Sequence, residues 1–201
     1  MIAVREGYEA IVQILLEARA KTNICDKMGR TPLMEAVVRW NSNIVSLMLD
    51  HSADPDAADS NGTTALILAA QSGHLQATMA LLIKGCEVDK RDKKNQTALM
   101  GAAASGSIEI IAALIDFGAD INASNCEGVN ALMMTSFYGH LEATQELVQG
   151  GAEINCKDNK NKTAKTHAIE QQHEEIVDFL NQWSSLEERA DKSLSETPDS
   201  Q

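Results

Sequence analysis

The amino-acid sequence repeats a pattern with a period of 33 residues. One position of each repeat holds a threonine, or in one case an asparagine: Thr31, Thr64, Thr97, Asn130 and Thr163. A period of this length is typical of solenoid proteins, in which each repeat is one small supersecondary unit. A single unit leaves an apolar face uncovered, and its neighbours cover that face when the units stack. The period therefore predicts a row of stacked units rather than one thick globular core.

Two further columns indicate the local structure of each unit. Five residues before the threonine column comes an acid or its amide, which favours a turn: Asp26, Asp59, Asp92, Asn125 and Asp158. Nine residues after the threonine column, glycine is the common residue, as in Gly73, Gly106 and Gly139, with Trp40 and Gln172 as departures. Threonine is a good helix N-cap, and glycine ends helices in the left-handed conformation. Each unit is therefore expected to hold a first short helix between these columns and a second helix after the glycine.

These motifs resemble the ankyrin repeat family. The resemblance is carried by "DKMGRTPLMEAV", "DSNGTTALILAAQSGHL", "DKKNQTALMGAAASGSI" and "NCEGVNALMMTSFYGHL", and by the returning segments "LLIKGCEVD" and "LIDFGADIN". It covers residues 1 to about 183. The fold that it implies is an all-α solenoid, an ankyrin repeat stack of helix-turn-helix units joined by β-hairpin-like turns.

The period divides the chain into units. Four complete repeats are expected at 26–58, 59–91, 92–124 and 125–157, and a polar C-terminal capping repeat at 158–183. Residues 1–25 form a truncated N-terminal repeat that holds mainly the second helix, so we expect a piece of a longer chain or an alternative start. Residues 184–201 have few large apolar side chains and many charges, which predicts a disordered acidic tail.

Composition excludes several classes of function. The net charge of −12 argues against nucleic-acid binding, which needs clustered Lys and Arg, and no apolar run approaches the length that spans a bilayer. The four cysteines are scattered and lack zinc-ligand spacing, which favours a cytoplasmic or nuclear protein without a metal site. No phosphate-binding loop and no local catalytic motif is present. We therefore expect neither catalytic residues nor cofactors.

Two further features concern individual positions of the repeat, one occupied by a tryptophan and one by histidines. A bulky residue at positive φ is strained, so Trp40 in the glycine column predicts that its turn re-forms at Asn41 or takes another shape, with the indole at the surface. The histidines His74, His140 and His173 share one column. Their regular spacing favours a structural role, with hydrogen bonds at helix starts and between repeats.

In an ankyrin-like stack, the turn tips and the exposed face of the first helices form the surface that binds partners. The candidate partner-binding residues on that surface combine arginines, aromatic residues and a basic island: Arg30, Arg39, Trp40, Lys93, Lys94, Phe137 and Tyr138. Arginine and aromatic residues are enriched at interface hot spots. Two alternatives stay open, namely that the aromatic residues pack across neighbouring turns and that the lysines are a solvated hairpin tip.

Two asparagines lie in segments that resemble sites modified by asparaginyl hydroxylases in ankyrin repeats. They are Asn122 in "LIDFGADINA" and Asn155 in "LVQGGAEINC". The alternative is that both side chains only bond the backbone of the bend.

The sequence thus predicts a non-enzymatic protein–protein interaction module that acts as an adaptor or scaffold and binds a partner protein as a monomeric stack. The alternative is an ankyrin regulatory or targeting region of a larger signalling enzyme or ubiquitin-ligase complex.

Overall fold

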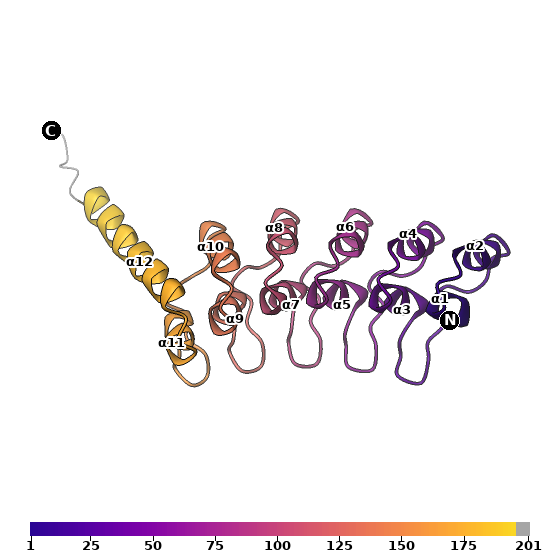
Figure 1. Ribbon diagram of the computed structural model, residues 1–201, viewed down its shortest axis with the longest axis horizontal. Helices are drawn as coiled ribbons and strands as arrows, with labels where there is room; N and C mark the ends of the chain where they lie inside the picture. The colour runs from indigo at the N-terminus through magenta and orange to yellow at the C-terminus, as the bar shows by residue number, and fades with distance from the viewer. Residues whose placement is uncertain (196–201) are drawn as a thin grey trace.

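Helices arranged in pairs, joined by hairpin-shaped loops, form one extended row (Figure 1). This computed structural model describes the backbone of residues 1–195 and the side chains of residues 1–186. The odd-numbered helices lie in one layer, the even-numbered helices lie in a second layer, and the hairpins project beyond the first layer. The helices are α1 (Ile2–Arg5), α2 (Glu9–Glu17), α3 (Pro32–Val38), α4 (Ser42–Asp50), α5 (Ala65–Gln71), α6 (Leu75–Ile83), α7 (Ala98–Ser105), α8 (Ile108–Asp116), α9 (Ala131–Tyr138), α10 (Leu141–Gln149), α11 (Ala164–Glu170) and α12 (Glu174–Ser195).

The predicted caps begin the first helix of each complete repeat. The Oγ1 of Thr64 accepts a hydrogen bond from the backbone N–H of Ile67 at 3.3 Å, and Asn130 caps α9 in the same way at 3.0 Å. In the hairpin before α5, Oδ1 of Asp59 accepts from the N–H groups of Asn61 and Thr63. Local side-chain hydrogen bonds therefore set both the turn and the start of the helix, which confirms the roles predicted for these two columns.

Successive hairpins are joined by backbone hydrogen bonds. The N–H of Ser60 donates to the carbonyl of Met28 at 2.9 Å, and equivalent bonds link each later hairpin to the one before it: Lys93 to Asn61, Cys126 to Lys94, and Asn159 to Glu127. The hairpins contain only isolated β-bridges within the described residues. The all-α solenoid with hairpin-like connections is confirmed.

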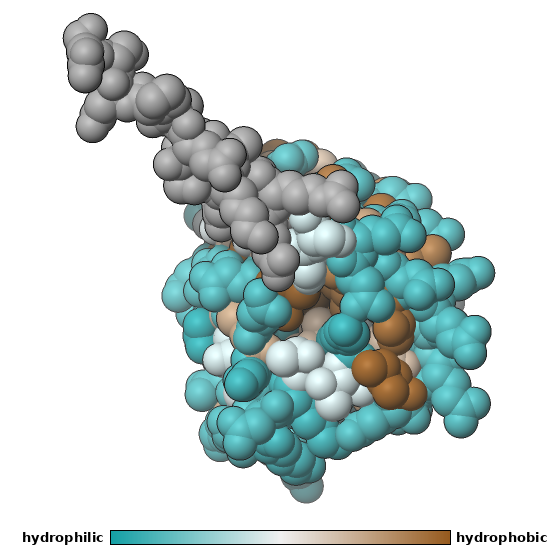
Figure 2. Space-filling view, turned by 90° about the vertical axis from the view of Figure 1, so that its left-hand side faces the viewer, coloured by the Kyte–Doolittle hydropathy of each residue, from teal (hydrophilic) through white to brown (hydrophobic). Residues whose placement is uncertain are grey.

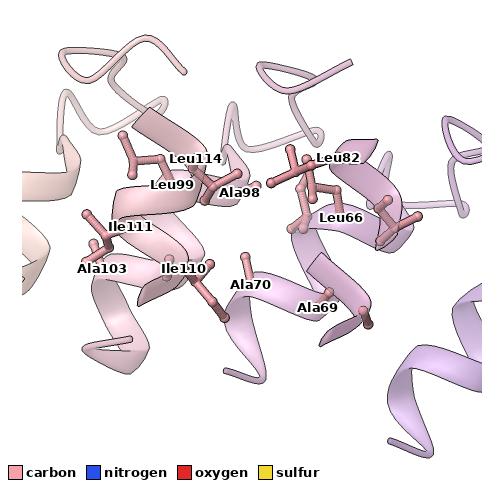
Figure 3. Close-up of a cluster of buried hydrophobic side chains, with 14 of the residues drawn as sticks. Leu66, Ala69, Ala70, Leu82, Ala98, Leu99, Ala103, Ile110, Ile111 and Leu114 are labelled. Atoms are coloured by element: carbon pink, nitrogen blue, oxygen red, sulfur yellow. The ribbon is translucent and has the colours of Figure 1, made fainter. Parts of the chain in front are cut away.

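Small and branched aliphatic side chains form the core between neighbouring repeats. Figure 3 shows alanines of α5 and α7 facing leucine and isoleucine side chains of α6 and α8. The residues labelled there are each at most 2% exposed: Leu66, Ala69, Ala70, Leu82, Ala98, Leu99, Ala103, Ile110, Ile111 and Leu114. No aromatic residue is among the fully buried core residues in the part of the chain with described side chains. Thin layers that alanine allows to approach closely explain why the chain contains only 3% aromatic residues.

The expectation for the turn at Trp40 is wrong. Trp40 keeps the left-handed conformation of its column, with φ of 58°, and Gln172 does so with φ of 62°. Asn41 instead caps α4, because its Oδ1 accepts from the N–H of Ile44 at 3.0 Å. The exposed indole stacks on the ring of His74 at a centroid distance of 4.6 Å. Trp40 thus gives its turn the shape that glycine gives in other repeats, and the predicted surface position of the indole is confirmed.

The histidine column has the structural role that its spacing predicts. The Nε2 of His74 lies 3.1 Å from Oγ of Ser42, that of His140 lies 3.3 Å from the carbonyl of Ala104, and that of His173 lies 3.1 Å from the carbonyl of Phe137. Each ring therefore ties its repeat to the previous one.

The predicted disordered tail is wrong for residues 184–195, because α12 continues through Ser195. The prediction rested on the charges and the few large apolar residues of this stretch. It overlooked that the stretch contains the helix-favouring residues Leu, Glu, Arg, Ala and Lys and no Gly or Pro. Residues 196–201 of the predicted tail lie outside the described residues. Seen from the C-terminal end, the last repeat presents mostly hydrophilic residues with a few hydrophobic ones among them (Figure 2).

Candidate functional site

A groove of about 670 Å³ lies on the surface where the odd-numbered helices meet the hairpins. We call this surface the inner face. The groove extends from α5 to α11 and is lined mostly by apolar residues of the helices and mostly by polar residues of the hairpins: Gln71, Gln96, Met100, Gly101, Ala104, Asn125, Glu127, Val129, Met133, Met134, Phe137, Tyr138, Asp158, Asn159, Lys160, Lys162, His167 and Glu170. Its volume lies in the range of clefts that hold small ligands or peptide side chains.

Two aromatic side chains at the end of α9 line the groove. Phe137 is 40% exposed and Tyr138 is 53% exposed, and their rings meet edge to face at 5.1 Å. The ring of His167 lies 6.1 Å from that of Phe137, and the carbonyl of Phe137 bonds His173. The backbone at Phe137 is thus held by the next repeat, while about half of each aromatic side chain stays open to a partner.

The floor of the groove is shaped by a glycine in α7. A Cβ atom at Gly101 would lie 2.7 Å from Cγ of Gln71 in α5. The missing side chain lets Gln71 approach α7, and Met134 and Phe137 line the same groove. Met134 is partly exposed in this floor and can adapt its shape to different partners, whereas Met100 and Met133 are each 1% exposed and belong to the core beneath it.

A buried carboxylate organises the C-terminal end of the groove. The Oδ1 of Asp158 accepts from the N–H groups of Lys160 and Lys162 at 2.8 Å, and Nε2 of His167 lies 3.1 Å from Oδ2. Burial alone would raise the pKa of Asp158, but the hydrogen bonds from Lys162, Lys160 and His167 hold it below its ordinary value.

The depressed pKa of Asp158 predicts a pH dependence. Because the folded pKa lies below the unfolded one, the stabilisation is present above the unfolded value and is lost as the pH falls through the folded value. Asp158→Ala should lower the free energy of unfolding by about 1–3 kcal/mol at pH 7. The difference from the unsubstituted chain should shrink below about pH 4. Urea unfolding across this pH range measures both effects.

Asp116 provides the matched control for that measurement, since it is exposed at the end of α8. Asp116→Ala should change the free energy of unfolding by less than about 0.5 kcal/mol both at pH 7 and below about pH 4. A cost at Asp158 that stays constant down to pH 2 would contradict the assignment.

The structure separates the sequence-predicted residues into four places. Phe137 and Tyr138 line the groove, whereas Trp40 stacks on His74 near the other end of the stack. Lys93 and Lys94 are exposed on the hairpin before α7 and do not line the groove.

Arg30 and Arg39 form the fourth place, where both approach the carboxylate of Glu35 in α3, at 3.8 and 3.3 Å. Sequence reasoning missed Glu35, and it also missed the groove residues Gly101, Met134 and His167. These four residues share one column of the repeat, in which the residue type changes from each repeat to the next.

Asn122 forms hydrogen bonds within and between bends. Its Oδ1 accepts from the N–H of Glu153 at 2.9 Å, and its own N–H donates to Oδ1 of Asp120 at 3.1 Å. Asn155 is exposed. The hydrogen bonds of Asn122 agree with the alternative that its side chain bonds the backbone of the bend, and hydroxylation of either residue stays a prediction.

A family model described as "Ankyrin repeats (3 copies)" matches residues 1–92, 77–158 and 99–192. The chain belongs to the ankyrin repeat family. No curated protein matches the sequence. Ankyrin repeats are protein–protein interaction modules and typically lack catalytic activity. The groove on the inner face is therefore a candidate site for a protein partner.

The described residues also bear on two other kinds of site, a metal centre and a membrane-spanning helix. They contain no group of three or more His, Cys, Asp or Glu side chains that could hold a metal ion. None of their helices combines the length and the apolar character needed to cross a membrane.

Proposed function

We propose that this ankyrin stack is a non-enzymatic adaptor or scaffold that captures a partner protein in the groove of its inner face. The observation that carries the proposal is the pair Phe137 and Tyr138, half-exposed in a groove that Met134 also lines, in a chain whose described residues include no aromatic side chain in the fully buried core. Such aromatic residues are the common anchors of protein interfaces. The polar hairpin side chains on the other wall supply hydrogen-bonding groups for a peptide backbone.

We also propose that the protein acts in the cytoplasm or nucleus. The four cysteines are free, and Cys25 and Cys126 are exposed. Exposed thiols remain free in a reducing compartment such as the cytoplasm or nucleus.

Affinity capture from a cell lysate tests the proposed site. The double variant Phe137→Ala/Tyr138→Ala should lose at least about thirtyfold in partner affinity, because interface hot spots contribute about 2 kcal/mol or more each. Quantitative mass spectrometry of the retained proteins measures the loss, and far-UV circular dichroism checks that the helices remain.

The matched control removes apolar side chains from the opposite layer. Ile83 ends α6 and is 69% exposed, and Phe117 follows α8 and is 43% exposed. Ile83→Ala/Phe117→Ala should retain the same proteins as the unsubstituted chain. If this control loses the partner while the groove variant keeps it, binding takes place on the other face and the proposed site is wrong.

A further inference from the structure

A buried carboxylate gathers three arginines at the N-terminal end of the inner face. Glu35 in α3 is 3% exposed. Its Oε1 accepts hydrogen bonds from Nε of Arg5 at 3.1 Å and from Nε of Arg39 at 3.3 Å, and its Oε2 lies 3.8 Å from Nη1 of Arg30. The arginines come from the end of α1, the hairpin before α3 and the end of α3. One acid thus fixes three basic side chains from different elements at one place, which we call the arginine cluster.

The repeat fold does not require this cluster. At 33-residue intervals the position of Glu35 is occupied by residues of other kinds: Leu68, Gly101, Met134 and His167. A buried ion pair stabilises a fold little compared with apolar packing, because the cost of removing the charges from water offsets their attraction. Stability therefore does not explain why this one repeat has a buried acid surrounded by arginines.

The cluster lies on the same surface as the groove. The column of Arg5 contains Ala104 and Phe137, and the column of Arg39 contains Tyr138. The column of Arg30 contains Gln96, Val129 and Lys162, and all of these later residues line the groove. The arginine cluster is therefore the N-terminal continuation of the inner face beyond the groove.

The cluster keeps hydrogen-bond donors for a ligand. Arg5 and Arg39 each bond Glu35 through Nε, and neither Nη atom of these two side chains has a partner among the described residues. Their side chains are 43% and 50% exposed. Arg30 is also bonded to Asp26, so three guanidinium groups face two carboxylates and the cluster carries a net positive charge in an acidic chain. Free guanidinium edges bind carboxylate and phosphoryl groups in a bidentate manner.

We propose that the arginine cluster binds an acidic segment of the partner polypeptide, through carboxylate or phosphoryl oxygens, while an apolar segment of the same polypeptide occupies the groove. This proposal rests on the proposed function for the apolar part only. The binding of an acidic segment is inferred from the geometry of the arginines, and its test does not depend on the groove.

The spacing of the layers predicts the spacing of the two partner segments. The cluster lies at α1 and α3, and the centre of the groove lies at α7 and α9, three helix layers further along the row (Figure 1). Packed helices lie 8–10 Å apart, which places the two sites on the order of 25–30 Å from each other. An extended chain advances about 3.3 Å per residue, so about eight residues separate the acidic segment from the apolar anchor.

Fluorescence anisotropy with short labelled peptides tests the anionic site. The probes are hexaglutamate and a hexapeptide whose only charged side chains are two phosphoserines, with the same hexapeptide in unphosphorylated form as a neutral reference. The intact chain should bind at least one acidic probe and not the reference, and the tighter of the two identifies carboxylate or phosphoryl as the preferred group. Arg5→Gln/Arg39→Gln should weaken binding of that probe by about tenfold or more, since it removes both sets of free donors.

The matched control removes two exposed basic residues after α2. Arg19→Gln/Lys21→Gln has the same net charge as the arginine variant and should bind the acidic probe as tightly as the unsubstituted chain. The groove variant Phe137→Ala/Tyr138→Ala should also bind it unchanged, which separates this test from that of the proposed function. Equal weakening in both charge variants would overturn the proposal, because it would show attraction by net charge alone. Tighter binding of a DNA oligonucleotide of equal charge would overturn the choice of a peptide.

Loss of both arginines leaves Glu35 poorly paired, so two further measurements keep the test independent of folding. Arg5→Gln/Arg39→Gln/Glu35→Gln removes the buried charge together with its partners and should show the same loss of binding. In the unsubstituted chain, the side-chain Nε resonances of Arg5 and Arg39 should shift when the acidic probe is added. Resonances that stay unchanged at saturating probe would overturn the proposal.

Discussion

Replacing Leu114 with alanine should lower the free energy of unfolding by about 2–5 kcal/mol. Leu114 in α8 is fully buried, within the cluster of aliphatic side chains between neighbouring repeats (Figure 3). Truncation removes apolar contacts and leaves a cavity that short rigid helices cannot close, and leucine-to-alanine changes in such places have costs of this size. Because each repeat contacts only its neighbours, loss at one layer weakens the stacking on both sides of it. Urea unfolding followed by circular dichroism measures the change.

Ile83 is the control for this substitution. It lies at the end of α6 and is 69% exposed, so Ile83→Ala removes an aliphatic side chain without opening a cavity. Its effect should stay within about 0.5 kcal/mol. Similar losses for Leu114→Ala and Ile83→Ala would show that the packing between layers does not hold the stack together.

The second large effect is expected at Gly29, in the hairpin before α3. Gly29 has φ of 77°, and a Cβ atom there would lie 2.8 Å from the backbone nitrogen of Ser60 in the next hairpin. That nitrogen donates the hydrogen bond to Met28 that joins the two hairpins. Gly29→Ala combines the cost of a left-handed alanine, about 1–2 kcal/mol, with forced separation of the hairpins, about 1–3 kcal/mol. Chemical unfolding should therefore show a loss of about 2–5 kcal/mol.

Gly85 separates the two contributions because it has the same φ of 77° and no atom within 4 Å of the added Cβ. Gly85→Ala should cost only the conformational part, about 1–2 kcal/mol. The difference between the two variants then reports the contact between hairpins. Equal losses would contradict a close approach of the hairpin backbones at Gly29.

The sequence was sufficient to predict the helices and turns because their determinants are local. Thr64 and Asp59 act through hydrogen bonds to backbone groups two to four residues away, so each repeat displays them in the same column. The turn at Trp40 was mispredicted because its conformation depends on more than the intrinsic preference of one residue. The cap at Asn41 and the ring of His74 from the next repeat accompany a φ that tryptophan alone disfavours.

The groove and the arginine cluster were only partly predictable. Phe137 and Tyr138 were found because exposed aromatic residues are unusual in this composition. Gly101 and Glu35 were missed because their column carries no signal for secondary structure and differs from repeat to repeat. Their importance depends on which side chains meet across layers, as with Gln71 against Gly101 and Arg5 against Glu35, and such contacts join residues about one repeat apart.

Site-specific photo-cross-linking tests most directly whether the groove is the partner-binding site. Tyr138→p-benzoylphenylalanine places a cross-linking group on the groove wall, and Phe117→p-benzoylphenylalanine places the same group beside the opposite helix layer. Irradiation in cell lysate should give one dominant covalent adduct with a protein from position 138, which excess unlabelled chain suppresses, and no such adduct from position 117. A competed adduct that forms from position 117 and not from position 138 would contradict binding in the groove.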